Sequence, residues 1–122
     1  MADVCPVIER YIAIWNETDP ARRRALLAET WSEDATYVDP LVVAEGHDAI
    51  DGTVAAAQAQ FPGFIFLLAG PVDAHHHLAR FTWELAPGAD ADAIVIGFDI
   101  AVLADDGRLR AVHVFLDKVP AA

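Results

Sequence analysis

Apolar residues recur at every third or fourth position in the first part of the chain, and they alternate or run together in the second half. Helical spacing over 4–16 predicts a first helix, with Tyr11 and Trp15 on one face because they lie four residues apart. The Asp-Pro pair at 19–20 can cap and begin a second helix that runs to about Trp31. An alanine-rich stretch over 49–60 predicts a third helix.

The rest of the pattern predicts strands that are separated by turn residues. The expected strands cover 35–39, 64–69, 73–85, 93–104 and 109–119. Gly70 and Pro71 are expected to separate two of them, and the stretch 105–108 is a strong hairpin signal. Helices followed by a meander of long strands favour an α+β fold, with the helices on one face of an antiparallel sheet. The length predicts a single domain over 1–122.

The strand over 94–103 is apolar at both side-chain parities, so both of its faces need cover. The helices can cover one face, and a second copy of the chain is the simplest cover for the other. We therefore expect a homodimer formed through the outer face of the sheet. Gly97, near the middle of this strand, is expected to mark a bend or a bulge.

Composition narrows the possible partners and the compartment. The 122 residues are 55% hydrophobic and include 19 acidic against 8 basic side chains, for a net charge of −11. This charge argues against nucleic acid and against anionic membranes as partners. No apolar run reaches the roughly 18 residues of a membrane span, and the first residues lack the pattern of a signal peptide. Because Cys5 is the one cysteine, a reducing cytoplasm is expected.

Three polar residues, Tyr11, Asp39 and Asp99, stand in runs that should belong to the core. A carboxyl group in such surroundings is costly unless it is paired or takes up a proton. Proteins accept that cost most readily where a perturbed pKa is useful. By strand parity, Tyr37 faces the same side as Asp39, and Ala101 faces the same side as Asp99. These residues are the candidates for a site.

Taken singly, each of the three polar residues also has a purely structural interpretation. Tyr11 could be a core tyrosine with its hydroxyl at the edge, and Asp39, which precedes a proline, could be a turn residue. Asp99 could face solvent or pair with an arginine such as Arg80 or Arg110.

A run of three histidines over 75–77 does not predict a metal site. Adjacent strand residues point to opposite faces, so the three rings cannot converge, and no nearby Cys or Glu completes a tetrahedral set. If Val114 and Leu116 face a pocket on the inner side of the sheet, His113 lies on the outer side, where the second copy is expected. The sequence shows no metal or cofactor motif, and we expect neither.

Several short stretches, in their order and spacing, resemble one known superfamily. They are Arg10-Tyr11-Ile12, the run from Asp34 to Pro40, Gly70-Pro71-Val72, and Asp99 nine residues before Arg108. Over 4–119 the sequence resembles the nuclear transport factor 2-like superfamily, in its SnoaL-like and ketosteroid isomerase-like branch. The resemblance implies a cone-shaped fold, in which three N-terminal helices pack on a strongly curved antiparallel sheet that encloses an apolar pocket.

The resemblance also implies a reaction and a role for each candidate. In the isomerases an aspartate base moves a proton beside a steroid ketone, while a tyrosine and a protonated aspartate hydrogen-bond the enolate oxygen. By position, Asp39 matches the base, Tyr11 the oxyanion tyrosine and Asp99 the protonated acid. Such a reaction needs a base and oxyanion donors but no cofactor. The residues that would line the cavity are Trp15, Tyr37, Val54, Phe81, Trp83, Ala101, Val114 and Leu116.

Where the isomerases have further tyrosines that bond to the oxyanion tyrosine, the matching positions hold Trp31 and Val54. The expected function is a cofactor-independent acid–base enzyme of ketosteroid isomerase-like type. It would act through an enolate on a small apolar carbonyl compound, steroid- or polyketide-like. A SnoaL-like polyketide cyclase or dehydratase is one alternative. A non-catalytic module that binds a small ligand in the same fold is another.

Overall fold

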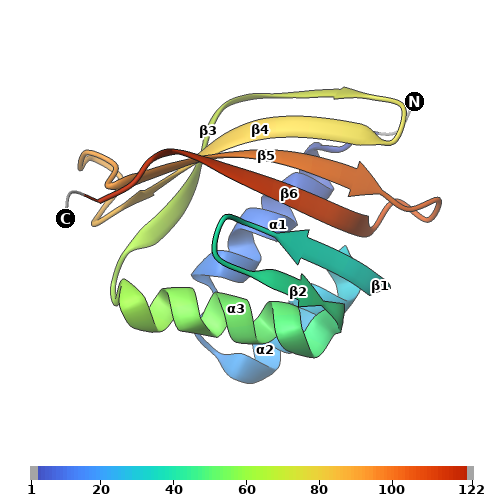
Figure 1. Cartoon of the computed structure of the whole chain (residues 1–122), viewed down its shortest axis with the longest axis horizontal. Coiled ribbons are helices and arrows are strands. Elements are labelled where there is room, and N and C mark those ends of the chain that lie inside the picture. The colour runs from blue at the N-terminus through green and yellow to red at the C-terminus, as the bar shows by residue number, and fades with distance from the viewer. Residues whose placement is uncertain (1–2, 121–122) are drawn as a thin grey trace.

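The computed structural model describes residues 3–120, which form three helices and one six-stranded sheet (Figure 1). The helices are α1 (Cys5–Asn16), α2 (Pro20–Thr30) and α3 (Gly46–Gln60). The strands are β1 (Trp31–Val38), β2 (Val43–Glu45), β3 (Ile65–His75), β4 (Leu78–Ala86), β5 (Val95–Leu103) and β6 (Leu109–Lys118). The two ends of the predicted domain, 1–2 and 121–122, lie outside the described residues.

The strands are arranged in the order β2-β1-β6-β5-β4-β3. All neighbouring pairs are antiparallel except β1 and β6, which run parallel. In Figure 1 the helices lie together on one side of the bent sheet, and β3 runs from the end of α3 to the far edge. The predicted α+β cone is therefore confirmed. The sheet, however, is mixed and open rather than wholly antiparallel.

The helices form where the sequence predicts them, with small changes at their ends. The buried side chains of α1 follow the apolar spacing of the sequence. α2 begins as predicted, because the Asp19 side chain accepts a hydrogen bond from the Arg22 backbone N–H at 2.9 Å and Pro20 occupies the first turn. α3 begins at Gly46, earlier than predicted. Within residues 3–120 no helix has the length and hydrophobicity to cross a membrane.

The prediction of one long strand over 73–85 is wrong, because the chain reverses direction inside that range. β3 continues past Gly70, which has a φ of +77° and lies in a bulge where the β3–β4 register shifts. The reversal instead uses His76, whose φ of 53° is a left-handed value found in tight turns. The register of β5 with β6 also shifts beside Gly97, where a bulge is predicted. β2, which pairs with β1, is too short to show a periodicity.

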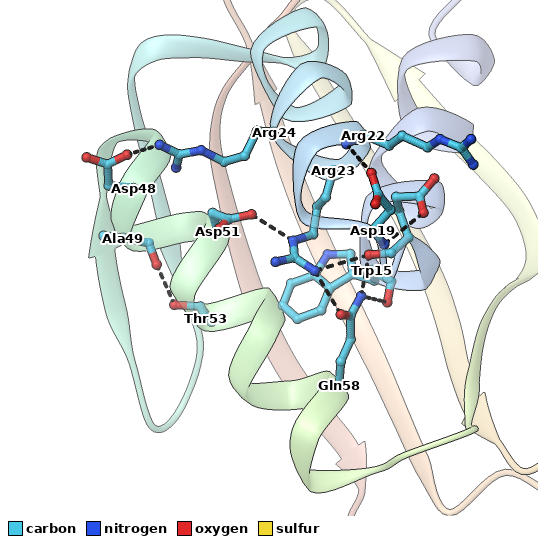
Figure 2. Close-up of polar contacts among 11 residues, drawn as sticks. Trp15, Asp19, Arg22, Arg23, Arg24, Asp48, Ala49, Asp51, Thr53 and Gln58 are labelled. Atoms are coloured by element: carbon cyan, nitrogen blue, oxygen red, sulfur yellow. Dashed lines mark hydrogen bonds and ion pairs between the residues drawn. The ribbon is translucent and has the colours of Figure 1, made fainter.

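A buried arginine ties the three helices together (Figure 2). Arg23 of α2 donates from Nε to Asp51 of α3 at 2.7 Å and from Nη1 to Gln58 of α3 at 2.9 Å. Gln58 in turn donates to the backbone carbonyl oxygen of Trp15 in α1 at 3.0 Å. Removing one partner would leave a buried charge or amide unsatisfied, so the network favours a single arrangement of the helices.

The face of the sheet away from the helices carries an apolar strip along β5. On β5, the side chains that alternate with the buried ones are partly exposed, and they include Phe98 and Ile100. Phe98 lies opposite Phe115 of β6, whose side chain is 62% exposed. A partly exposed apolar strip of this kind favours association. We therefore propose that a second copy of the chain covers this face.

Replacing Phe115 by glutamate should disrupt such a dimer, because each subunit would bring a negative charge to an apolar contact. We expect Phe115→Glu to sediment as a monomer and the unchanged protein as a dimer in analytical ultracentrifugation. Ala56→Glu adds the same charge on an exposed position of α3 and should leave the dimer intact. A monomeric unchanged protein, or equal behaviour of the two variants, would contradict this assembly.

Candidate active site

A cavity of about 280 Å³ lies between the helices and the concave face of the sheet. Its walls come from α1, α3 and the strands β1, β3, β4, β5 and β6. Six aromatic side chains contribute to them: Tyr11, Trp15, Tyr37, Phe61, Phe66 and Trp83. Among the described residues, Asp39 is the one acidic side chain in the lining, and no Lys, Arg or His takes part. An apolar cavity with a few polar groups is the usual form of a small-molecule site.

Asp99 of β5 is fully buried, and both of its carboxyl oxygens are hydrogen-bonded. The Tyr11 hydroxyl, from α1, donates to Oδ2 at 3.0 Å. The Trp83 indole N–H, from β4, donates to Oδ1 at 2.8 Å. Three elements thus meet at one carboxyl group, and neither of the arginines considered from the sequence is its partner.

The surroundings of Asp99 favour its protonated form. Burial raises the pKa of Asp99 from 3.8 to about 7, against the opposing effect of the hydrogen bonds from Trp83 and Tyr11. The negative charge of Asp39 contributes to the same rise in pKa. Burial, followed by the nearby Asp99 charge, likewise raises the pKa of Tyr11 well above its ordinary value, so Tyr11 stays a neutral phenol. Near neutral pH the Tyr11–Asp99 pair therefore holds either one or two protons.

Gly97 allows Trp83 to reach Asp99. The two residues lie opposite each other in the β4–β5 pairing, and Asp99 lies two positions further along the same face of β5. A Cβ atom at position 97 would lie 2.1 Å from atoms of the Trp83 indole ring. The indole therefore lies across β5 in space that any other side chain would occupy, and this places its N–H on the carboxyl group.

Asp39, just after β1, is held by three donors. The Tyr37 hydroxyl donates to Oδ2 at 2.7 Å. The backbone N–H groups of Leu41 and Val42 donate to Oδ1 at 2.8 and 2.9 Å. Because a carboxylate oxygen can accept about two hydrogen bonds, Oδ1 is saturated and Oδ2 keeps one free lone pair. Burial and the charge of Asp39 raise the pKa of Tyr37 far above its ordinary value, so its hydroxyl remains a donor.

The structure places two of the three predicted site residues in the cavity wall and the third behind it. Tyr11 and Asp39 line the cavity. Asp99 lies behind Tyr11 and is not part of the wall, so its expected direct contact with substrate does not fit this geometry. Of the predicted walls, Trp15, Tyr37, Trp83, Val114 and Leu116 line the cavity.

Three predicted wall residues, Val54, Phe81 and Ala101, lie in the closed core instead. Phe81 packs edge-on against Tyr11, with ring centroids 5.7 Å apart. Strand parity identifies the correct face for Phe81 and Ala101 but not how far along the strand the cavity extends. The cavity ends at the level of Trp83, one rung before Phe81 and Asp99.

Two hydrogen-bonded pairs and part of the cavity wall are not predicted from the sequence. No sequence pattern predicts that Trp83 donates to Asp99, because this hydrogen bond depends on the register between β4 and β5. The hydrogen bond from Tyr37 to Asp39 does have a sequence signal, because the two residues are two positions apart on one face of a strand. Leu41 and Phe61 also line the cavity, and both stand beside a proline at the end of an element.

The histidines play no part in this cavity. The run over 75–77 forms the exposed β3–β4 turn, where the Nδ1 atoms of His75 and His76 lie 3.1 Å apart. His113 is exposed on the outer face, on the side that parity predicts. Within 3–120, no three His, Cys, Asp or Glu side chains are grouped to hold a metal ion.

Solved structures that resemble this chain include one that is similar in sequence and others that are similar in fold alone. A "putative isomerase of the SnoaL-like family" from Agrobacterium tumefaciens is 42% identical, with 92% of this chain and 95% of that chain covered and a TM-score of 0.85. A "putative polyketide cyclase" from Sinorhizobium meliloti is 15% identical over 90% and 94% of the two chains, with a TM-score of 0.70. A "putative SnoaL-like polyketide cyclase" from Jannaschia is 17% identical over 91% and 85%, with a TM-score of 0.67. No protein-family model and no curated protein sequence matches the chain.

Adding a methyl group at Gly97 should displace Trp83 from Asp99. Because the indole ring and the strand must move apart, we expect Gly97→Ala to lower the free energy of unfolding by about 1–3 kcal/mol, measured by urea denaturation. Gly52→Ala, in α3 and with nothing within 4 Å of the added atom, is the control and should stabilise the protein by up to about 1 kcal/mol. Equal stability of Gly97→Ala and the unchanged protein would contradict the close approach.

Proposed function

This chain belongs to the SnoaL-like family, and we propose that it is an acid–base enzyme of ketosteroid isomerase-like type. It moves a proton beside the carbonyl group of a small, uncharged, apolar substrate through an enolate, with Asp39 as the base. One observation carries the proposal: in the described residues, a mostly apolar cavity has one carboxylate in its lining, Asp39, which keeps one free lone pair, and the phenol of Tyr11 lines the same cavity.

The proton-accepting atom is Oδ2 of Asp39. Both lone pairs of Oδ1 accept backbone N–H groups, so only Oδ2 can take a proton without breaking a bond. The Tyr37 hydroxyl donates to Oδ2 and fixes its direction. Asp39 would remove a proton from the carbon next to the carbonyl group and return it to another carbon of the enolate, which shifts the double bond.

Tyr11 supplies the hydrogen bond to the enolate oxygen, and Asp99 acts through it. While Asp99 is ionised, the Tyr11 proton points at Asp99 and away from the cavity. Once Asp99 holds a proton, it can donate to the Tyr11 oxygen, and the Tyr11 proton is free to turn toward the substrate. Asp99 is therefore a positioning residue, because it does not reach the cavity.

The lining indicates the kind of substrate. With no Lys, Arg or His in the described wall, and a net charge of −11, an anionic substrate would find no partner. The aromatic walls suit a flat molecule. At about 280 Å³ the cavity lies near the lower end of the ~300–1,000 Å³ range of ligand pockets, so one or two rings fit inside it. A four-ring steroid would extend beyond the mouth.

Removing the base should abolish turnover but not binding. We expect Asp39→Asn to slow isomerisation of a β,γ-unsaturated cyclic ketone by roughly a hundredfold or more, because it cannot accept the proton. The measurement is the ultraviolet absorbance of the conjugated product. Asp117→Asn, which alters an exposed carboxylate on β6, is the matched control and should keep the full rate. Turnover by Asp39→Asn at the normal rate would exclude Asp39 as the base, and binding without turnover by the unchanged protein would favour a non-catalytic ligand-binding module.

The proton on Asp99 should appear in the pH profile. Because the pKa of Asp99 is about 7 and the active form is protonated, kcat/KM should fall as the pH rises above about 7. Asp99→Asn keeps an acceptor for Trp83 and gives Tyr11 a permanent N–H donor. We expect this variant to remain active and to lose the alkaline decline. Retention of that decline in Asp99→Asn would assign it to another group.

The same group should also change stability. Between pH values of about 3.8 and 7 the folded protein binds more protons at Asp99 than the unfolded chain, so its contribution to stability falls with rising pH and is constant above about 7. The Asp99→Asn variant has no titrating group at this position, so it does not lose stability in this way as the pH rises. Its free energy of unfolding should therefore rise relative to the unchanged protein by about 1.4 kcal/mol per pH unit across that window.

A further inference from the structure

Leu41 lies at the mouth of the cavity and is 89% exposed, the most exposed large apolar side chain of the described residues. It belongs to the turn 39–42, which connects β1 to β2 and begins with the proposed base. On this rim Val119 is also exposed, and Pro120 follows it in the lining. The rim is therefore apolar where the cavity meets water.

We propose that Asp39 has a second role, in which its Oδ1 atom holds the turn 39–42 and so places Leu41 as the outer wall for an apolar extension of the substrate. The inference rests on the proposed function in taking this cavity as the substrate site. It adds a specificity-determining residue, Leu41, and a substrate feature, an apolar group that reaches the mouth.

The turn depends on Asp39 more than on any other residue in it. Both the Leu41 and Val42 N–H groups donate to Oδ1, at 2.8 and 2.9 Å. The Asp39 backbone N–H donates to the Val42 carbonyl oxygen at 2.9 Å and closes the turn from the other side. Pro40, which has no N–H and a fixed φ, leaves the turn few other conformations. The Val42 N–H also donates to the Asp39 backbone carbonyl oxygen at 3.4 Å, so without Oδ1 the two side-chain bonds would be lost and the two backbone bonds would remain.

Comparison with Val43 shows that Leu41 differs from other exposed apolar residues in its position. Val43 on β2 is 68% exposed but does not line the cavity, whereas Leu41 does. A single exposed apolar residue needs no explanation. Leu41, in contrast, lies at the opening of an aromatic cavity, and Asp39 holds its turn in place. A ligand that enters the cavity would cover the Leu41 side chain, and this burial would favour binding.

The two oxygens of Asp39 divide the two roles. Oδ2 carries the free lone pair and takes the proton, while Oδ1 keeps its bonds to the turn. The outer wall can therefore stay in place throughout a reaction cycle. It follows that Asn at this position, with an oxygen for the backbone N–H groups and an amide that can donate to the Tyr37 hydroxyl, keeps the wall and loses the base. Alanine loses both.

The first experiment compares two ketones that differ only in an apolar tail, acetophenone and para-butylacetophenone, by quenching of tryptophan fluorescence. We expect Leu41→Ala to weaken binding of para-butylacetophenone about tenfold and that of acetophenone about twofold or less, because only the tail reaches the rim. Val43→Ala is the matched control and should change neither. Equal effects of Leu41→Ala and Val43→Ala, equal weakening of both ketones, or failure of the unchanged protein to bind either ketone would overturn the inference.

The second experiment separates the two roles of Asp39 without measuring turnover. In hydrogen–deuterium exchange, the Leu41 amide, which donates to Oδ1, should be protected in the unchanged protein and in Asp39→Asn and should exchange rapidly in Asp39→Ala. The Val42 amide keeps its longer bond to the Asp39 carbonyl oxygen and should change less. Binding of para-butylacetophenone should follow the same order. A protected Leu41 amide in Asp39→Ala would overturn the inference. If Asp39→Asn turned over normally while Leu41→Ala still weakened binding of the longer ketone, the proposed base would fail and the outer wall would stand.

Discussion

The buried carboxyl group of Asp99 is the constraint on which the site depends. It lies where α1 meets the sheet and accepts hydrogen bonds from Tyr11 of α1 and Trp83 of β4. Two donors do not fully replace water around a charge, and this is why its pKa is raised to about 7. This buried carboxyl group joins α1 of the helix layer to the centre of the sheet.

The shape of the cavity follows from the same contact. To reach Asp99, the Trp83 indole must lie across β5, and this is possible only because residue 97 is glycine. Once there, the indole closes the inner end of the cavity, and everything beyond it, including Phe81, is packed core. The same carboxyl group thus sets both the depth of the cavity and the direction of the Tyr11 hydroxyl, so depth and chemistry are coupled through one residue.

Local patterns in the sequence predict most of this fold, but they do not predict features that depend on contacts between distant residues. Helical spacing and the Asp19 cap give the helices, and parity gives the face on which Asp39 and Asp99 lie. The parallel pairing of β1 with β6 joins segments that lie far apart in the sequence, and no local pattern contains it. The hydrogen bond of Trp83 likewise depends on the β4–β5 register. A glycine beside a proline indicated a turn at Gly70, but the flanking strands continued through it as a bulge.

The two aspartates influence each other through their charges, and the proposed reaction makes use of this. The negative charge of Asp39 is among the causes that raise the pKa of Asp99. When Asp39 takes the substrate proton, that charge moves to the enolate oxygen beside Tyr11, whose own oxygen lies 3.0 Å from Asp99. The negative charge therefore moves toward Asp99, where like-charge repulsion makes its ionisation less favourable still. The proton that frees Tyr11 is held most firmly while the enolate exists, which is when the hydrogen bond from Tyr11 is needed.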